Sequence, residues 1–95
     1  MIQETSLRAY WDVVDTLGLR QYIVFQRLSA EPMTNTELSD RLGWAINTVT
    51  PRVYELREKG LVGEQEKRTC KITGKKCISW HVIQPRLEQS QLFYR

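Results

Sequence analysis

Apolar side chains recur at intervals of three and four in the first thirty residues, which is the spacing of one face of a helix. The first run follows Ser6, a suitable N-cap, and reaches Gly18, a suitable helix end. Its members are Leu7, Tyr10, Trp11, Val14 and Leu17. The pattern predicts one helix over this run and a second helix from about Leu19 to Ser29. Pro32 prevents the second helix from continuing, because the residue before a proline avoids helical geometry.

A short helix is predicted after this proline. Thr34 and Glu37 have the spacing of a capping box, in which the hydroxyl and the carboxylate each accept a hydrogen bond from the other residue's amide. Gly43 ends the helix with a left-handed turn that other residues resist. Trp44 and Ile46 are expected to fill the angle between this helix and the next one. The spacing therefore predicts two helices packed at a steep angle across a glycine turn.

The next helix is predicted from Asn47, as its N-cap, to Lys59, with Pro51 tolerated in the first turn. Three apolar residues form its inward stripe: Val49, Val53 and Leu56. The opposite side then faces outward and carries Asn47, Thr48, Pro51, Tyr54 and Glu55, with Thr50 and Arg52 at its flanks.

Two strands are predicted next, over Leu61–Thr69 and Cys77–Ile83, with a turn near Thr73-Gly74. In the second strand the alternating apolar residues are Ile78, Trp80 and Val82. The expected class is α+β and mainly α, with helices followed by a two-stranded β-hairpin. A chain of 95 residues holds one domain at most. We divide it into an N-terminal helix (1–18), a core (19–83) and a C-terminal tail (84–95).

The helix, glycine turn and helix between Met33 and Val62 resemble a known family. The stretch Met33-Thr-Asn-Thr-Glu-Leu-Ser-Asp-Arg-Leu-Gly43, with Asn47-Thr-Val-Thr-Pro-Arg-Val-Tyr-Glu-Leu-Arg-Glu-Lys-Gly-Leu-Val62, is similar to the winged helix-turn-helix of MarR-like regulators. It also resembles small phage and prophage regulators, and the resemblance covers Leu19–Val82. It implies a winged helix-turn-helix that binds double-stranded DNA. Because the chain lacks a long dimerisation helix pair with a ligand pocket, we expect no small-molecule ligand, effector or cofactor.

The resemblance places base contacts at the N-terminal end of the helix that starts near Asn47, which enters the major groove in this motif. The matching residues are Asn47, Thr48, Thr50 and Arg52. Asn and Arg make bidentate hydrogen bonds to adenine and guanine, and Thr contacts bases or phosphates. Pro51 is placed to touch a thymine methyl group. The alternative is that Asn47 only caps the helix and that both threonines are ordinary first-turn residues.

Basic residues are concentrated in the second half of the chain. Residues 1–46 contain four Lys/Arg and six Asp/Glu, residues 47–95 contain ten and five, and residues 67–87 contain no acid. This asymmetry favours a polyanionic partner, although a solvated basic loop is the alternative. Four cations lie at or near the expected hairpin tip and are assigned to DNA phosphates: Arg68, Lys71, Lys75 and Lys76. Four such contacts predict a slope of log affinity against log salt of roughly −4.

Cys70, Cys77 and His81 give little support for a metal site. Cys77 and His81 are separated by roughly 13 Å along a strand, which is too far to share one ion. If the loop consists only of Thr73-Gly74, the two cysteines face each other and a disulfide is geometrically allowed, but two reduced thiols are expected. The sequence contains no catalytic motif, so we predict no enzymatic activity. Without a signal-peptide pattern or a membrane-length apolar run, a cytoplasmic protein is expected.

Two other partner classes remain as alternatives. A winged-helix adaptor that binds protein would present an apolar or acidic outward face, whereas the helix near Asn47 is mostly polar. Binding to RNA or single strands would need exposed aromatics on the sheet, and Trp80, the one strong candidate, is expected to be buried. The aromatic residues Tyr10, Trp11, Tyr22 and Phe25 are expected in the core. A homodimer through the N-terminal helix or the C-terminal tail is also considered.

Overall fold

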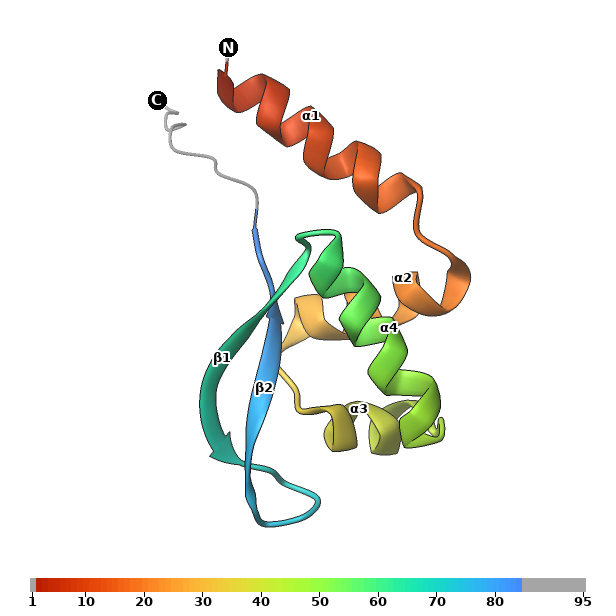
Figure 1. The fold of residues 1–95 in the computed structure, drawn as a ribbon, viewed down its shortest axis with the longest axis vertical. Helices are drawn as coiled ribbons and strands as arrows, with labels where there is room; N and C mark the ends of the chain where they lie inside the picture. The colour runs from red at the N-terminus through yellow and green to blue at the C-terminus, as the bar shows by residue number, and fades with distance from the viewer. Residues whose placement is uncertain (1, 85–95) are drawn as a thin grey trace.

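The computed structural model describes residues 2–84 of the 95-residue chain, with side chains from Leu7 onward. Four helices are followed by a two-stranded antiparallel hairpin (Figure 1). In chain order the elements are α1 (Ile2–Asp15), α2 (Leu19–Ala30), α3 (Asn35–Leu42), α4 (Ile46–Glu58), β1 (Val62–Thr69) and β2 (Lys76–Val82). The predicted α+β class with mainly helical content is confirmed. Each helix within residues 2–84 is too short or too polar to cross a bilayer.

The hydrophobic core lies around α4, which contacts α2, α3 and β1. The inward stripe predicted for this helix is confirmed, since Val49, Val53 and Leu56 are at most 2% exposed. Leu38 of α3 and Val24 of α2 are buried against the same cluster. Burying such side chains contributes about 1.5–3 kcal/mol each, so this stripe fixes which side of α4 remains outside.

The first two helices have different boundaries from those predicted. α1 begins at Ile2, so Ser6 lies inside the helix and is not its N-cap. α1 ends at Asp15, and Gly18 is instead the N-cap of α2, where its amide donates to Oε1 of Gln21 at 3.0 Å. Glycine is compatible with both kinds of helix end, which explains the wrong assignment.

The α3 and α4 helices meet as the glycine turn predicts. The Thr34 hydroxyl accepts from the Glu37 amide and the Glu37 carboxylate accepts from the Thr34 amide, both at 3.1 Å. Gly43 adopts a φ of 71°, the left-handed conformation in which α3 ends. The N-cap of α4 is Ala45, so the prediction that Asn47 caps this helix is wrong.

The hairpin is tied to the helices by a short backbone bridge. Met33 and Trp80 exchange two hydrogen bonds, with N···O distances of 3.1 and 2.8 Å. The segment before α3 therefore adds one pair of ladder contacts to the edge of β2. This bridge fixes the position of the hairpin relative to the start of α3.

The strands pair from Val62 opposite Val82 to Thr69 opposite Lys76, with an irregularity between Glu64 and Lys67. The predicted alternation in β2 is only partly correct. Val82 is buried, but Ser79 is also buried, whereas Ile78 and Trp80 are half-buried. The irregularity inserts one extra residue into β1 opposite this part of β2, and such a bulge bends and twists a hairpin locally.

Candidate nucleic-acid interface

One side of α4 is turned to solvent. Asn47, Thr50, Pro51 and Tyr54 are all exposed, and Tyr54 is 58% exposed. We call these four residues the outer face of α4. The inward stripe places them there, because successive residues advance about 100° around a helix. Thr48 is half-buried beside this face.

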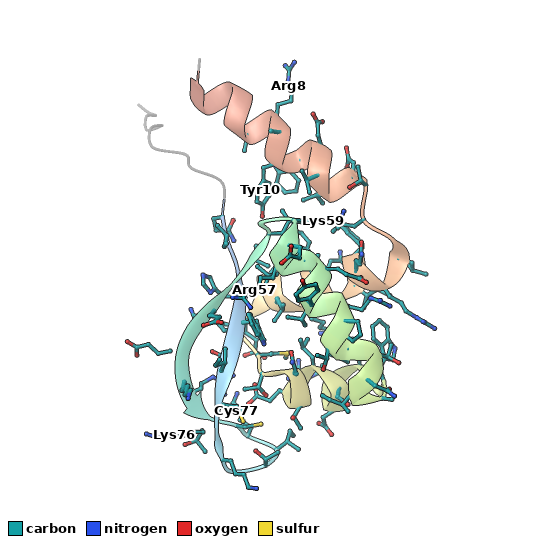
Figure 2. The ribbon with its side chains drawn as sticks, in the orientation of Figure 1. Arg8, Tyr10, Arg57, Lys59, Lys76 and Cys77 are labelled. Carbon is teal, nitrogen blue, oxygen red and sulfur yellow. The ribbon has the colours of Figure 1, made fainter. Side chains whose placement is uncertain are left out.

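The hairpin tip, which comprises residues 70–76, lies at the same end of the molecule as the start of α4 (Figure 1). Lys71, Lys75 and Lys76 of this tip are exposed. The side chain of Lys76 projects away from the hairpin (Figure 2). Three lysines therefore lie at the same end of the fold as the first turn of α4.

A groove of about 130 Å³ separates α4 from the hairpin. Its lining comprises Asn35, Thr50, Val53, Tyr54, Arg57 and Trp80. Arg57 lies over the Trp80 ring at 5.6 Å from its centroid and also contacts Glu64 at 3.4 Å. Arg57 therefore covers one face of the half-buried tryptophan, which also lines the groove.

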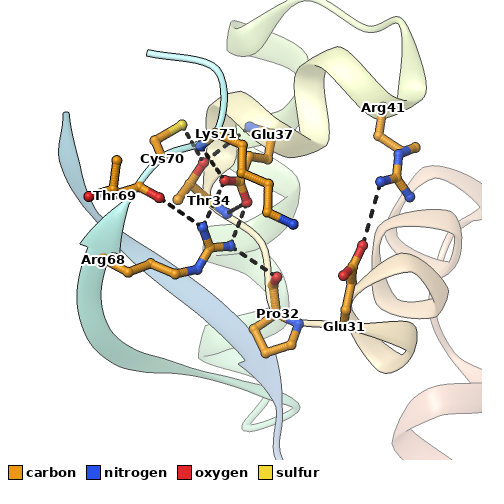
Figure 3. Close-up of polar contacts among 9 residues, drawn as sticks. All are labelled: Glu31, Pro32, Thr34, Glu37, Arg41, Arg68, Thr69, Cys70 and Lys71. Atoms are coloured by element: carbon orange, nitrogen blue, oxygen red, sulfur yellow. Dashed lines mark hydrogen bonds and ion pairs between the residues drawn. The ribbon is translucent and has the colours of Figure 1, made fainter. Parts of the chain in front are cut away.

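Arg68, one residue before the end of β1, forms contacts within the protein that the sequence analysis did not predict. Its guanidinium donates to both oxygens of Glu37, at 2.8 and 2.6 Å, and to the carbonyl of Pro32 at 3.2 Å (Figure 3). Arg68 therefore holds the hairpin to the start of α3. The phosphate contact assigned to Arg68 stays a prediction, and both terminal nitrogens of its guanidinium already donate to a carboxylate within the protein.

The Glu37 carboxylate is surrounded by donors. Besides the two bonds from Arg68, it accepts from the amides of Thr34 and Lys71, at 3.1 and 2.8 Å. The Arg68 hydrogen bonds are the main cause that lowers the pKa of Glu37 from 4.5 to about 2, against the opposing effect of burial. Sequence reasoning found the cap but missed this ion pair, since nothing in the local pattern connects residues 31 positions apart.

Arg52 is also engaged within the protein. Its Nε and Nη2 atoms donate to the two carboxylate oxygens of Glu55, each at 2.8 Å. Gln21 of α2 donates to the same carboxylate at 2.8 Å. Hydrogen bonds from Arg52 and then Gln21 lower the pKa of Glu55. The structure thus places Arg52 on the side of α4 that meets α2, and it separates this residue from Asn47 and Thr50.

Other side chains also differ from expectation. Ile46 is 46% exposed and does not fill the angle between α3 and α4, whereas Trp44 packs against the core. Among the aromatics expected inside, Phe25 is buried, but Trp11 and Tyr22 are exposed. Trp11 and Tyr22 therefore lie outside the predicted core, although their spacing fits the apolar stripe of a helix.

The two cysteines do not face each other. Cys77 pairs with Arg68, and the amide of Cys70 donates to the carbonyl of Lys75, so the loop is longer than two residues. Both thiols are free. Cys70 is buried 3.2 Å from the Thr34 hydroxyl, and this contact is the main cause that lowers the pKa of its thiol to about 7.

Residues 2–84 contain no group of three or more His, Cys, Asp or Glu side chains arranged to hold a metal ion. At this end of the molecule, the exposed start of α4 lies near a loop that carries three exposed lysines. Comparison of the sequence with models of known protein families gives no match, and comparison with curated proteins gives no significant match either.

Proposed function

We propose that this chain is a winged helix-turn-helix protein that binds double-stranded DNA. In this proposal α4 enters the major groove, and the hairpin acts as the wing, with its tip on the phosphate backbone. The order of helices and hairpin supports the fold. The backbone bridge between Met33 and Trp80 supports it further, because it sets the hairpin beside the start of α3.

The observation that carries the proposal is the shared position of the outer face of α4 and the three exposed lysines of the hairpin tip. The amide and hydroxyl groups of this face suit base edges, and lysines suit phosphates. Asn47 has the donor and acceptor that match the N7 and N6 groups of adenine. Thr48 and Thr50 supply hydroxyl contacts to bases or phosphates, and Lys71, Lys75 and Lys76 supply the affinity that does not depend on sequence.

We further propose that the protein regulates transcription in a bacterium or phage and works in the cytoplasm. The proposal includes no catalytic step, cofactor or small-molecule ligand. Two copies are proposed to pair through α1, since Trp11 on that helix is 49% exposed. The predicted contribution of the C-terminal tail falls almost wholly on residues 85–95, which lie outside the described residues.

The test is binding to fluorescent random-sequence duplexes, measured by anisotropy at two salt concentrations with the full chain. We expect binding that weakens as salt rises, and a triple variant with Lys71, Lys75 and Lys76 changed to Ala that binds much less at low salt. A matched control changes Arg8, Arg20 and Arg27 to Ala, which removes the same charge from α1 and α2. Absence of binding in dilute buffer, or equal loss in both triple variants, would overturn the proposal.

A second candidate is a winged-helix adaptor that binds another protein. The exposed aromatic side chains of Trp11 and Tyr22 favour it, because aromatic residues are enriched in protein interfaces.

The proposed pairing of two copies through α1 has its own test. Light scattering on the native chain and on Trp11→Ser distinguishes self-association from a monomer. A concentration-dependent dimer that Trp11→Ser dissociates supports pairing through α1, whereas a monomer at all concentrations contradicts it.

A further inference from the structure

The positive charges of α4 are occupied within the chain. Arg52 is bound at both ends of its guanidinium to Glu55, and Arg57 lies over Trp80 and contacts Glu64. Lys59 stands at the opposite end of the helix, where it is the C-cap. Arg and Lys are the side chains that recognise guanine through O6 and N7. The first two turns of α4 therefore present no uncommitted cation that suits guanine.

The same two turns expose apolar groups. Ile46 is 46% exposed and lies one helical turn before Thr50, so both are on one flank of α4. Pro51 is exposed beside them. The thymine C5-methyl is the one apolar group that base pairs display in the major groove, and aliphatic side chains contact it. Asn47, between these residues, matches the adenine of the same A·T pair.

We infer that α4 selects A·T base pairs, with Ile46, Thr50 and Pro51 contacting thymine methyl groups and Asn47 contacting adenine. This inference rests on the proposed function, because it specifies which bases the proposed helix recognises. The lysines at the hairpin tip bind phosphates of any sequence. Selectivity between base pairs therefore depends on the small apolar and amide surface formed by these four residues of α4. The internal ion pair of Arg52 contributes by committing a guanine-binding group to Glu55.

The test compares two pools of random-sequence duplex, one made with thymine and one with uracil, which differ only in the C5-methyl group of each thymine. We expect the protein to bind the thymine pool more tightly and to enrich A·T-containing sites from it. Each methyl group that loses its contact weakens binding to an enriched site by about fourfold. Replacing adenine with 7-deazaadenine in an enriched site weakens binding by about tenfold, because it removes the N7 acceptor.

Two protein variants locate the effect. Thr50→Ser removes one methyl group and keeps the hydroxyl, and Ile46→Ala removes most of an exposed aliphatic side chain. Both are expected to reduce the preference for thymine over uracil. Ile83→Ala is the matched control, since Ile83 is 42% exposed and follows β2 at the far end of the hairpin from its tip.

The outcomes separate this inference from the proposed function. Duplex binding with equal affinity for the thymine and uracil pools overturns the inference and leaves the proposed function intact. Enrichment of G·C-only sites, or a uracil penalty that Thr50→Ser and Ile46→Ala leave unchanged, also overturns it. Absence of any duplex binding overturns both.

Discussion

Arg68 of β1 and Glu37 of α3 form a bidentate ion pair with N···O distances of 2.6 and 2.8 Å. The two residues are 31 positions apart in the sequence. The carboxylate is buried and also caps α3, so one side chain sets both the start of a helix and the position of the hairpin. The orientation of the hairpin tip relative to α4 therefore depends on this pair.

Removal of the arginine is expected to destabilise the fold. Arg68→Ala leaves the buried Glu37 carboxylate with two backbone donors only, which costs about 2 kcal/mol of unfolding free energy. Urea unfolding followed by circular dichroism measures the loss. Lys71→Ala serves as the control, because it also removes one positive charge. If Arg68→Ala unfolds at the same urea concentration as the native chain, the internal role assigned to Arg68 is wrong.

The ion pair of Arg68 and Glu37 makes the unfolding free energy depend on pH. Because the pKa of Glu37 is lowered from 4.5 to about 2, its contribution is complete above pH 4.5 and is lost as the pH falls toward 2. The contribution amounts to about 3 kcal/mol at most. Unfolding free energy measured from pH 6 to pH 2 is expected to fall less steeply for Glu37→Gln than for the native chain.

A matched control for this acid dependence is Glu31→Gln. Glu31 contacts Arg41 at 3.5 Å with both side chains close to half exposed, a kind of pair that contributes little. Its replacement should leave the slope between pH 6 and pH 2 unchanged. Equal slopes for the native chain and Glu37→Gln would contradict the proposed linkage.

The salt dependence of DNA binding tests which of the basic residues contact phosphates. With Arg68 bound to Glu37, the three lysines of the hairpin tip predict a slope of log affinity against log salt of about −3 in place of −4. Lys75→Ala is expected to reduce the magnitude of this slope by about one. Anisotropy titrations at four salt concentrations measure both values, and an unchanged slope in Lys75→Ala would remove this lysine from the interface.

Base preference is expected to respond to Asn47 and not to Arg52. Asn47→Ala should relax selection at one base pair, at a cost of about 1–3 kcal/mol at that position. Arg52→Ala should leave the selected sequence unchanged, because its guanidinium is held by Glu55. Sequencing of duplexes selected by each variant gives the comparison, and relaxed selection by Arg52→Ala would show that this ion pair opens on DNA.

Local patterns in the sequence predicted much of the fold. The inward stripe of α4, the capping box of α3 and the left-handed turn at Gly43 each depend on residues within a few positions of one another. The helix boundary at Gly18 was misplaced because glycine suits either helix end. Ala45 was overlooked as an N-cap because its side chain makes no capping bond.

The site was less predictable because side-chain partners decide which cations are available. The Arg68–Glu37 pair joins distant segments and leaves no local signal. The Arg52–Glu55 pair did leave one, since residues three apart on a helix are neighbours and opposite charges attract. A rule that checks each candidate cation for an acid three or four positions away would have set Arg52 aside.

The two attachments of the hairpin, Met33 with Trp80 and Glu37 with Arg68, leave Ile72, Thr73, Gly74 and Lys75 exposed between them. The length of this stretch is consequently independent of how the helices assemble. Residues inserted between Thr73 and Gly74 would lengthen the reach of the lysines along a duplex while both anchors stay in place. In the proposed complex, the span of DNA that the protein covers is therefore a separately adjustable property, open to engineering by loop extension alone.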